Sequence, residues 1–296
     1  MCSLPSPHIF PNVEARIRIP NSYEEDVERT TMPGAYDRSR QGAVVREISA
    51  NFDEALSKFF GTQAPNPVAA QGAHDAYVAA LRAHGTEVTV LPSLDEYPDC
   101  CFVEDTAVMI DGKVIVPNMG HPSREGEQVD VANHLGQTAE IVQMPAGATL
   151  DGGDVVFFDD RYLVGLSTRT NLAGAEFLAE HVRADDFEVE FIDIPSSTLH
   201  LTTVCSSPRE GMLLAAEGHL TPSQIEPLAE NVIWVPNEET YAANTIGYRG
   251  DRVIVADGFS FTRQALLDEG FRLTSVDMNE IMQADGSLTC LSVFSA

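Results

Sequence analysis

The chain has 296 residues, 44% of them hydrophobic, and can bury a large core as one large domain or two small ones. Its formal net charge of −27 opposes binding to nucleic acid phosphates and to anionic lipid surfaces. No apolar run approaches the roughly 20 residues that cross a bilayer, and the first residues lack the basic-then-apolar order of a signal peptide. The acidic surface would attract a cationic small molecule, although scattered acids are also typical of a surface that only keeps a protein soluble.

The first elements can be predicted in chain order. Residues 1–41 are rich in Pro, Arg, Asp and Glu and have little periodicity, so we expect an N-terminal extension before a single domain over residues 42–296. A strand is predicted at Ala43–Ile48. A helix over Val68–His84 has apolar residues at helical spacing, and the strand Glu87–Leu91 follows it.

A unit of two strands, a tight turn between them and a following helix recurs along the chain. Asp105–Glu127 turns at Asp111-Gly112, a strong hairpin signal, and Asp154–Glu176 repeats it at equal length with its turn at Asp159-Asp160. Val204–Ala216 is a weaker copy, and Asn244–Val255 turns at Arg249-Gly250-Asp251. The other expected elements are the helices Glu127–Leu135, Ala173–Val182 and Thr262–Glu269 and the strands Glu188–Ile194 and Val232–Val235.

With Ala43–Ile48 as the start of another unit, the repeats number about five, and their alternating strands and helices predict an α/β fold. Repeats bury their apolar faces against neighbours, so five of them must stack or close into a ring. A closed ring would bring loops beside the strands to a common centre, where residues far apart in the sequence would meet. Periodicity alone leaves an open sheet as the alternative.

Three residues have the chemistry of a nucleophilic site. A lone cysteine such as Cys290 is usually a small core hydrophobe, but a thiol is also the natural nucleophile for a guanidinium carbon. His200 is either a buried core histidine or a general acid and base. Asp151 opens an Asp-Gly-Gly-Asp run, which is either a simple turn or a device that aims a carboxylate at His200, as in a catalytic triad.

Further charged residues are grouped before and after the predicted strands. Asp99, Glu104 and Asp105 fall within seven residues ahead of a buried strand. Carboxylates bind a guanidinium in bidentate geometry, although solvated turn acids have the same composition. Arg124 and Arg169 occupy similar loops of two repeats, so they could converge on a substrate carboxylate.

The sequence gives no support for a metal or a cofactor. It contains no phosphate-binding glycine loop, no GxSxG nucleophile motif and no HExxH metal motif. His121, His200 and Cys290 have the side chains of metal ligands, but their spacing matches no metal site. The five cysteines, at positions 2, 100, 101, 205 and 290, match no disulfide framework either, which favours reduced thiols and a cytoplasmic protein.

Seven short segments between residues 43 and 294 together resemble one known family. They are Phe102–Ala107, Gly120 with Pro122–Arg124, Leu150–Val155, Val164–Ser167 with Arg169–Asn171, Leu199–Leu201, Ala242–Asn244, and Asp285-Gly286 with Leu288–Cys290. In order and spacing they resemble dimethylarginine dimethylaminohydrolase (dimethylargininase), within the guanidine-modifying pentein superfamily. Glu104 follows the form of this family, whereas the related arginine and agmatine deiminases tend to have an arginine there. Ser287 departs from the family, which has an apolar residue at that position.

The resemblance implies a five-bladed α/β propeller of ββαβ units around a pseudo-fivefold axis. It implies hydrolysis of asymmetric dimethylarginine or monomethylarginine to citrulline plus dimethylamine or methylamine. By this resemblance Cys290 matches the nucleophile of a covalent thiouronium intermediate, His200 the acid and base, and Asp151 the carboxylate that orients it. The residues expected to bind the substrate are Asp99, Glu104 and Asp105 at the guanidinium, Arg124 and Arg169 at the carboxylate, Leu56 as a lid residue, and Ala284.

Three other functions stay open at this point. The first is another pentein guanidine-modifying activity, such as an arginine deiminase. The second is a catalytically silent module that binds arginine-like ligands, and the third is a zinc or redox sensor that uses Cys290 and His200. We expect a small-molecule substrate as the partner, with no nucleic acid and no membrane, and we leave a homodimer open.

Overall fold

The structure is a computed structural model that describes residues 40–110, 112–184 and 187–295. The predicted N-terminal extension therefore lies outside the described residues except for its last two positions, and Asp111 of the first predicted turn also lies outside them. Within the described ranges, no helix is long and apolar enough to cross a membrane.

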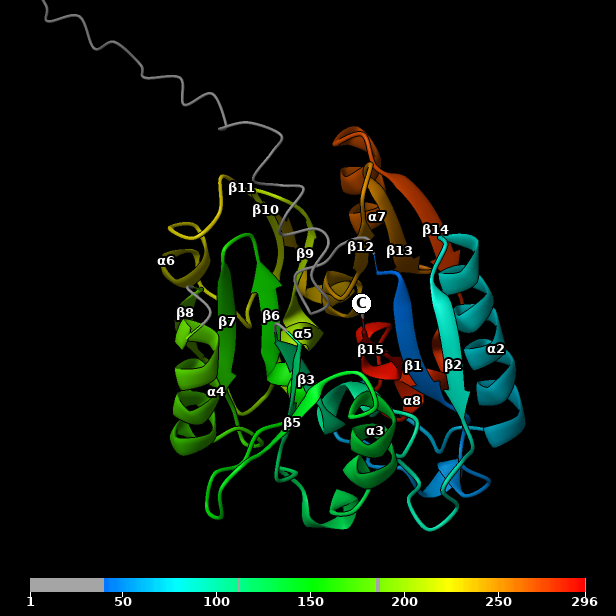
Figure 1. Ribbon diagram of the computed structural model, residues 1–296. Helices are drawn as coiled ribbons and strands as arrows, with labels where there is room; N and C mark the ends of the chain where they lie inside the picture. The colour runs from blue at the N-terminus through cyan, green and yellow to red at the C-terminus, as the bar shows by residue number, and fades with distance from the viewer. Residues whose placement is uncertain (1–39, 111, 185–186, 296) are drawn as a thin grey trace, which may run out of the picture.

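Five three-stranded sheets make up the described chain (Figure 1). In each sheet the first two strands are antiparallel and the third is parallel to the second. The sheets are β15 (Val293–Phe294), β1 (Gly42–Arg46) and β2 (Glu87–Leu91); β3 (Val108–Ile110), β4 (Lys113–Val116) and β5 (Glu140–Gln143); β6 (Val155–Phe158), β7 (Arg161–Leu166) and β8 (Glu188–Asp193); β9 (Cys205–Arg209), β10 (Met212–Ala216) and β11 (Asn231–Val235); and β12 (Ile246–Tyr248), β13 (Arg252–Ala256) and β14 (Arg272–Val276).

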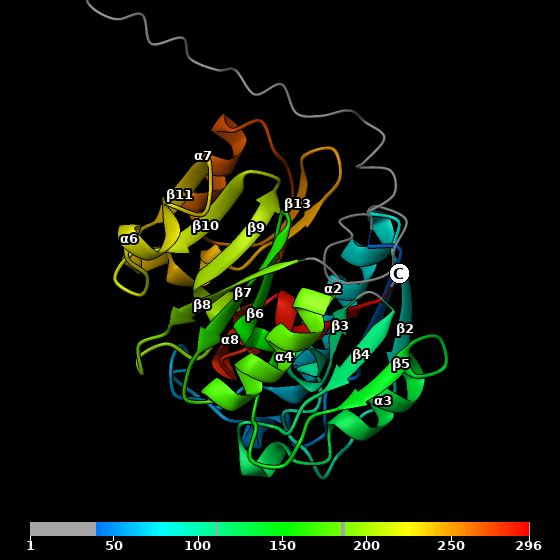
Figure 2. The ribbon, with the colours of Figure 1, turned by 60° about the vertical axis from the view of Figure 1, so that its left-hand side comes forward.

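A helix connects the second strand of each sheet to the third, as a parallel connection requires. These helices are α2 (Pro67–Ala83), α3 (Gln128–Leu135), α4 (Leu172–Ala184), α6 (Pro222–Ile225) and α7 (Ser260–Asp268). Figures 1 and 2 show α2, α4 and α7 on the outside of the molecule, against the third strands. The α/β repeat is therefore confirmed, and the predicted helices and third strands match the observed ones to within two residues at either end.

The helix α2 shows why these elements form where they do. The Asn66 side chain accepts hydrogen bonds from the backbone N–H groups of Val68 and Ala69, both at 3.0 Å, and Pro67 takes the first helical position. The buried face of α2 includes Tyr77, Val78 and Leu81, which pack into the largest apolar cluster. The chain then leaves the helix through Gly85, whose φ of +99° suits a glycine.

The buried side chain of His74 on α2 should make the fold sensitive to acid. Among the described residues, neither of its ring nitrogens has a hydrogen-bond partner, and its burial lowers its pKa to about 4. The folded state then binds this proton less tightly than the unfolded chain. The free energy of unfolding is therefore undiminished by His74 above the unfolded pKa of about 6.5. It falls by on the order of 3 kcal/mol as the pH is lowered to 4, because the unfolded chain takes up the proton first. We expect His74→Leu to lose less stability than wild type between pH 7 and pH 4 in urea unfolding, and equal losses would contradict this.

Two details of the sheets differ from the sequence prediction. The partner of β1 is β15 at the other end of the chain, with Ala43 opposite Phe294 and Val44 opposite Val293. A strand of two residues has no periodicity to read, so β15 was not predicted. In addition, Val204 does not open the hairpin predicted over Val204–Ala216, because it ends the short helix α5 (Leu201–Val204), which stands between His200 and β9.

One short helical turn precedes the first strand of every sheet. These turns are η2 (Val103–Thr106), η4 (Gly152–Asp154), α5, η5 (Asn237–Ala243) and η6 (Thr289–Leu291). Contacts join η6 to η2, η2 to η4, η4 to α5 and α5 to η5. The Asn244 side chain accepts from the Thr289 N–H at 3.1 Å and donates to the Thr289 hydroxyl at 2.9 Å, which links η5 back to η6. Five turns from distant parts of the sequence thus meet in one place.

Candidate active site

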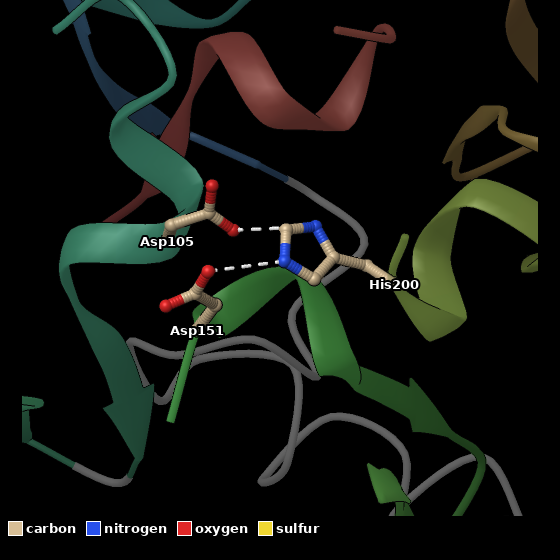
Figure 3. Close-up of side chains that lie close together, drawn as sticks. All are labelled: Asp105, Asp151 and His200. Carbon is tan, nitrogen blue, oxygen red and sulfur yellow. Dashed lines mark hydrogen bonds and ion pairs between the residues drawn. The ribbon is translucent and has the colours of Figure 1, made fainter. Parts of the chain in front are cut away.

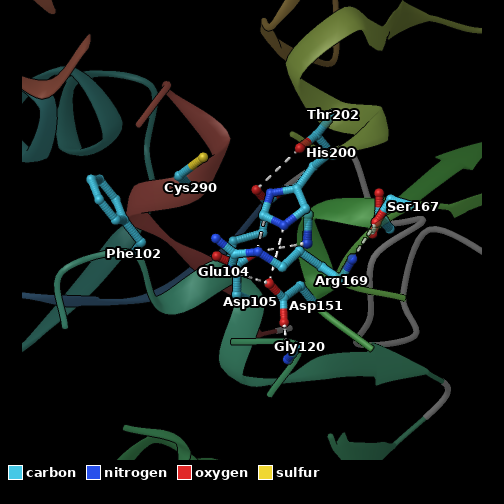
Figure 4. Close-up of polar contacts among 12 residues, drawn as sticks. Phe102, Glu104, Asp105, Gly120, Asp151, Ser167, Arg169, His200, Thr202 and Cys290 are labelled. Carbon is cyan, nitrogen blue, oxygen red and sulfur yellow. Dashed lines mark hydrogen bonds and ion pairs between the residues drawn. The ribbon is translucent and has the colours of Figure 1, made fainter. Parts of the chain in front are cut away.

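A narrow pocket lies beside these turns and contains most of the predicted site. Cys290 and His200 both line it. So do six more of the ten predicted site residues, namely Leu56, Asp99, Asp105, Arg124, Arg169 and Ala284. Figure 4 shows the sulfur of Cys290 on one side of the site and the ring of His200 on the other. The two remaining predicted residues, Asp151 and Glu104, lie behind this pocket and are described below.

The Cys290 side chain is only 5% exposed and lies 3.2 Å from the Ser287 hydroxyl. Burial raises the pKa of the Cys290 thiol well above its usual value, and the nearby carboxylates of Glu104 and Asp105 raise it further. A resting thiol in this environment stays protonated. A cation bound in the pocket would favour the thiolate.

The imidazole of His200 is buried between two carboxylates (Figure 3). Its Nε2 atom lies 3.1 Å from Oδ2 of Asp151, and its Nδ1 atom lies 3.7 Å from Oδ1 of Asp105. Burial lowers the pKa of His200, but the charge of Asp105 and the hydrogen bond to Asp151 outweigh burial and raise the pKa to about 9. His200 is therefore a cation at neutral pH and can donate a proton into the pocket.

Asp151 is fully buried behind His200. Its Oδ1 atom accepts the Gly120 N–H at 2.7 Å, and its Oδ2 atom accepts from Nη1 of Arg169 at 3.1 Å. Burial opposes its ionisation, yet the hydrogen bond to His200 and the neighbouring cations lower the pKa of Asp151 to about 2. An ionised carboxylate therefore lies behind the imidazole at neutral pH.

The second acid of the Asp-Gly-Gly-Asp run, Asp154, joins two loops. Its carboxylate accepts the hydroxyls of Ser167 and Thr170, both at 2.6 Å, and the Leu201 N–H at 3.0 Å. Burial raises the pKa of Asp154 to about 6. This residue fixes the loop of Arg169 against the turn that follows His200, a role that the sequence did not reveal.

Arg124 is 3% exposed and is bound mainly by the protein itself. Its guanidinium donates to Oδ2 of Asp105 at 2.5 Å, to the Phe102 carbonyl at 2.9 Å and to the Glu127 carboxylate at 2.8 Å. The other oxygen of Asp105 accepts the Gly153 N–H at 3.0 Å. Arg124 thus holds Asp105 in place, and its expected contact with a substrate carboxylate stays a prediction.

Two further basic side chains line the pocket beside Arg169. They are Lys58 and His121, neither of which was predicted to bind substrate. Burial lowers the pKa of His121, and the charges of Arg169 and Lys58 lower it further, so this imidazole is neutral at neutral pH. Lys58 and Arg169 therefore add positive charge to the pocket, in addition to the acids around His200. His121 stands between Gly120 and Pro122 of one family segment, whereas nothing in the sequence near Lys58 distinguishes it from a surface residue.

Glu104 lies outside the pocket that contains Cys290. Its Oε2 atom accepts the Thr289 hydroxyl at 2.9 Å and the Thr202 hydroxyl at 3.4 Å, and all three residues line a second cavity. Burial raises the pKa of Glu104 to about 8. Glu104 therefore bridges α5, which follows His200, and η6, which precedes β15. Its expected contact with the guanidinium stays a prediction.

One group of side chains has the geometry of a metal site. Asp105, Asp151 and His200 each offer one ligand atom, and these atoms lie within 4.8 Å of one another. However, Arg124 and Arg169 already place guanidinium groups on the two carboxylates, and their positive charge opposes a dication there. The group fits a network of carboxylates around a protonated imidazole better than it fits a metal.

Gly153 provides a test of how closely this network is packed. A Cβ at this position would lie 2.6 Å from Nδ1 of His200 and 2.8 Å from Oδ1 of Asp105. Because the ring must move away, we expect Gly153→Ala to lower kcat by roughly 10²-fold. In Gly72→Ala on α2 the new Cβ meets nothing within 4 Å, so this control should keep full activity and gain stability. Equal activity of the two variants would show that the position of the ring does not matter.

The chain is an enzyme of the pentein fold class. It has five sheets with the same strand arrangement, and one pocket that contains a cysteine and a protonated histidine. The chain belongs to the N,N dimethylarginine dimethylhydrolase family, whose eukaryotic model matches residues 50–294.

Two similar proteins support the assignment to this family. N(G),N(G)-dimethylarginine dimethylaminohydrolase from Streptomyces coelicolor is 31% identical over 255 residues, which cover 85% of this chain and 95% of the relative. The enzyme of the same name from Pseudomonas aeruginosa is 29% identical over 222 residues, 74% of this chain and 86% of its own length.

Solved structures give the same result. A cysteine-to-serine mutant of the Pseudomonas aeruginosa enzyme, in complex with citrulline, matches with a TM-score of 0.79 at 27% identity and covers 86% of this chain and 98% of that one. The N-terminal domain of the cyanobacterial arginine dihydrolase ArgZ matches with a TM-score of 0.75 at 16% identity, which shows the shared fold alone.

Proposed function

We propose that this chain hydrolyses Nω-methylated arginines, namely asymmetric dimethylarginine and monomethylarginine, to citrulline and dimethylamine or methylamine. The observation that carries the proposal is the pairing of Cys290 with a protonated His200 in one pocket that also holds Asp99 and Asp105. The structure of the Pseudomonas aeruginosa enzyme with citrulline adds support, and so does that of a dimethylarginine dimethylaminohydrolase adduct with S-methyl-L-thiocitrulline, because both ligands are relatives of such a substrate or product.

The charges of the pocket suit a zwitterionic amino acid with a guanidinium side chain. Asp99 and Asp105 are both buried, so they interact strongly with a cation that displaces water. Arg169 has one nitrogen on Asp151, and with Lys58 it provides positive charge for the substrate carboxylate. The guanidinium would then lie toward Cys290 and the carboxylate toward Lys58 and Arg169. Leu56 and Ala284 would complete the walls.

The first half of the reaction forms a covalent bond to Cys290. The bound guanidinium favours the thiolate, so the Cys290 thiol releases its proton to solvent water as the substrate binds. The thiolate attacks the central carbon and forms a carbon–sulfur bond. The carbon–nitrogen bond to the methylated amine then breaks, and protonated His200 supplies the proton that lets the amine leave. Asp151 stabilises the imidazolium before transfer and keeps the ring in one orientation.

The second half restores the enzyme. Neutral His200 accepts a proton from a water molecule as its oxygen attacks the thiouronium carbon. The carbon–sulfur bond breaks, the second proton of the water passes to the departing sulfur and restores the Cys290 thiol, and citrulline is released. His200 again carries the proton that the next cycle requires.

We also propose that the five sheets close into the propeller that the family resemblance implies. The chain of contacts among the five turns, with the hydrogen bonds between Asn244 and Thr289, supports closure. Residues 42–296 would then form one catalytic domain. Four described cysteines, all free and buried, favour a reducing cytoplasmic location. A homodimer stays an open proposal.

The decisive experiment incubates the pure protein with asymmetric dimethylarginine, monomethylarginine or arginine and measures both citrulline and the released amine. We expect citrulline with dimethylamine or methylamine in equal amounts, and little reaction with arginine. Citrulline and ammonia from plain arginine would instead identify a deiminase. Binding of methylated arginine without any product would identify a binding module.

A further inference from the structure

A buried carboxylate that the proposed reaction does not use lies five residues before Cys290. Asp285 is 5% exposed, and its backbone has a φ of +58°. This left-handed conformation is uncommon for a residue with a side chain, although aspartate tolerates it better than most. It turns the chain directly after α8 (Asn279–Gln283), so that the carboxylate faces the segment Lys58–Gly61.

The carboxylate of Asp285 caps a run of four consecutive backbone N–H groups. Oδ1 accepts from Phe60 at 2.7 Å and from Phe59 and Gly61 at 3.1 Å each. Oδ2 accepts from Phe59 at 3.1 Å and from Lys58. Four convergent N–H donors on one carboxylate are far more than a turn requires, and charge-assisted hydrogen bonds are stronger than neutral ones.

Neighbouring side chains extend this attachment in both directions. The Gln283 side chain accepts the Thr62 N–H at 2.8 Å and the Gln63 N–H at 3.1 Å, and Asp99 accepts the Leu56 N–H at 3.1 Å. The two segments approach so closely that a Cβ on Gly61 would lie 2.1 Å from the Gln283 carbonyl. The segment from Leu56 to Gln63 is therefore held mainly by side chains of other segments.

Both partners of this attachment form walls of the pocket. Lys58 and Phe59 line it from one segment, and Asp285 and Cys290 line it from the other. The nucleophile segment is fixed in turn, because the Tyr241 hydroxyl donates to the Gly286 carbonyl at 2.7 Å. The position of the Lys58 wall and the position of the Cys290 segment thus depend on one carboxylate.

We propose that Asp285 is a positioning residue, whose carboxylate holds the Lys58–Gly61 wall over the substrate and against the segment that carries Cys290. The inference rests on the proposed function for what the pocket binds. Without this carboxylate, four N–H groups lose their acceptor and the wall opens to water. Substrate binding would then weaken, and the thiol of Cys290 would become accessible to solvent.

The test compares three variants of the full chain. Asp285→Gly keeps the left-handed backbone and removes the carboxylate, whereas Asp285→Asn keeps one acceptor oxygen without the charge. Asp251→Gly is the matched control, because Asp251 has a φ of +55° in an exposed turn away from the pocket.

We expect Asp285→Gly to raise KM for methylated arginine by about tenfold or more, with a smaller loss in kcat, since charge-assisted hydrogen bonds of this strength correspond to at least that factor. The KM of Asp285→Asn should lie between the KM values of Asp285→Gly and wild type, and Asp251→Gly should have the KM and kcat of wild type. A merely structural role would lower the amount of folded enzyme without this separation of KM from kcat.

Two measurements do not depend on turnover. Trypsin should cleave the Lys58–Phe59 bond faster in Asp285→Gly, and iodoacetamide should label Cys290 faster, each by about tenfold, with fragments and labelled peptides identified by mass spectrometry. If wild type shows no turnover but these rates still change, the proposed function fails and the positioning role stands. If cleavage, labelling and KM of Asp285→Gly stay within twofold of wild type, or if Asp251→Gly shows the same changes, the positioning role is wrong.

Discussion

Replacement of Cys290 by serine should abolish turnover while the protein stays folded. The hydroxyl is a much weaker nucleophile than the thiol, and His200, the imidazole that could activate a hydroxyl as a base, is protonated at neutral pH. Loss of a nucleophile in an enzyme of this type lowers kcat by about 10⁴-fold or more. The measurement is citrulline formation from asymmetric dimethylarginine under saturating substrate.

The control for this variant is Cys205→Ala. Cys205 is also a fully buried free thiol, but it lies on β9 and does not line the pocket of Cys290. It should retain wild-type kcat, and both variants should show an unfolding midpoint near that of wild type. In wild type, acid quenching during turnover should trap a mass increase on the peptide that contains Cys290. Turnover by Cys290→Ser at the wild-type rate would remove Cys290 from the mechanism.

Replacement of His200 by alanine should lower kcat by about 10²–10⁴-fold, because neither the leaving amine nor the attacking water would have a proton partner. In the wild type, the pKa of about 9 sets the alkaline limit of the first step. The histidine is protonated below that pH and loses its proton as the pH rises through it, so kcat/KM should fall above about pH 9.

A second variant tests the origin of that limit. Asp151→Asn keeps a hydrogen-bond acceptor next to Nε2 of His200 but removes a negative charge that raises the pKa of the imidazole. The alkaline fall of kcat/KM should therefore move to lower pH in this variant. An unchanged pH profile in Asp151→Asn, or rapid steady turnover by His200→Ala, would contradict the assigned role of His200.

The repeated architecture could be predicted because each unit leaves a local pattern. Hairpin turns such as Asp159-Asp160 and Arg249-Gly250-Asp251 stand between alternating apolar runs, and the helices show apolar residues at helical spacing. The pairing of β1 with β15 could not be predicted in this way, since it joins Ala43 to Phe294 and involves only two residues of the later strand.

The residues that line the site were easier to predict than the contacts among them. Cys290, His200 and Asp151 have reactive side chains in recognisable motifs, and the structure brings Cys290 and His200 to one pocket with Asp151 behind the ring. The binding of Arg124 to Asp105, and the place of Glu104 beside the second cavity, depend on tertiary distances that no spacing encodes. Asp285 lies in one of the family segments, but its hydrogen bond to Phe60 joins residues 225 positions apart, and Lys58 belongs to a loop whose composition resembles that of any surface turn.

The strand pairing between β1 and β15 also has a consequence for folding kinetics. It gives the molecule a contact of very high sequence separation, whose loop-closure entropy must be overcome before the contact contributes stability. Cys290 lies only three residues before β15, so the nucleophile reaches its final position only when this closure occurs. Recovery of activity during refolding should therefore lag behind the recovery of helical circular dichroism, because a helix such as α4 packs mainly on β7 and β8, which lie next to it in the chain.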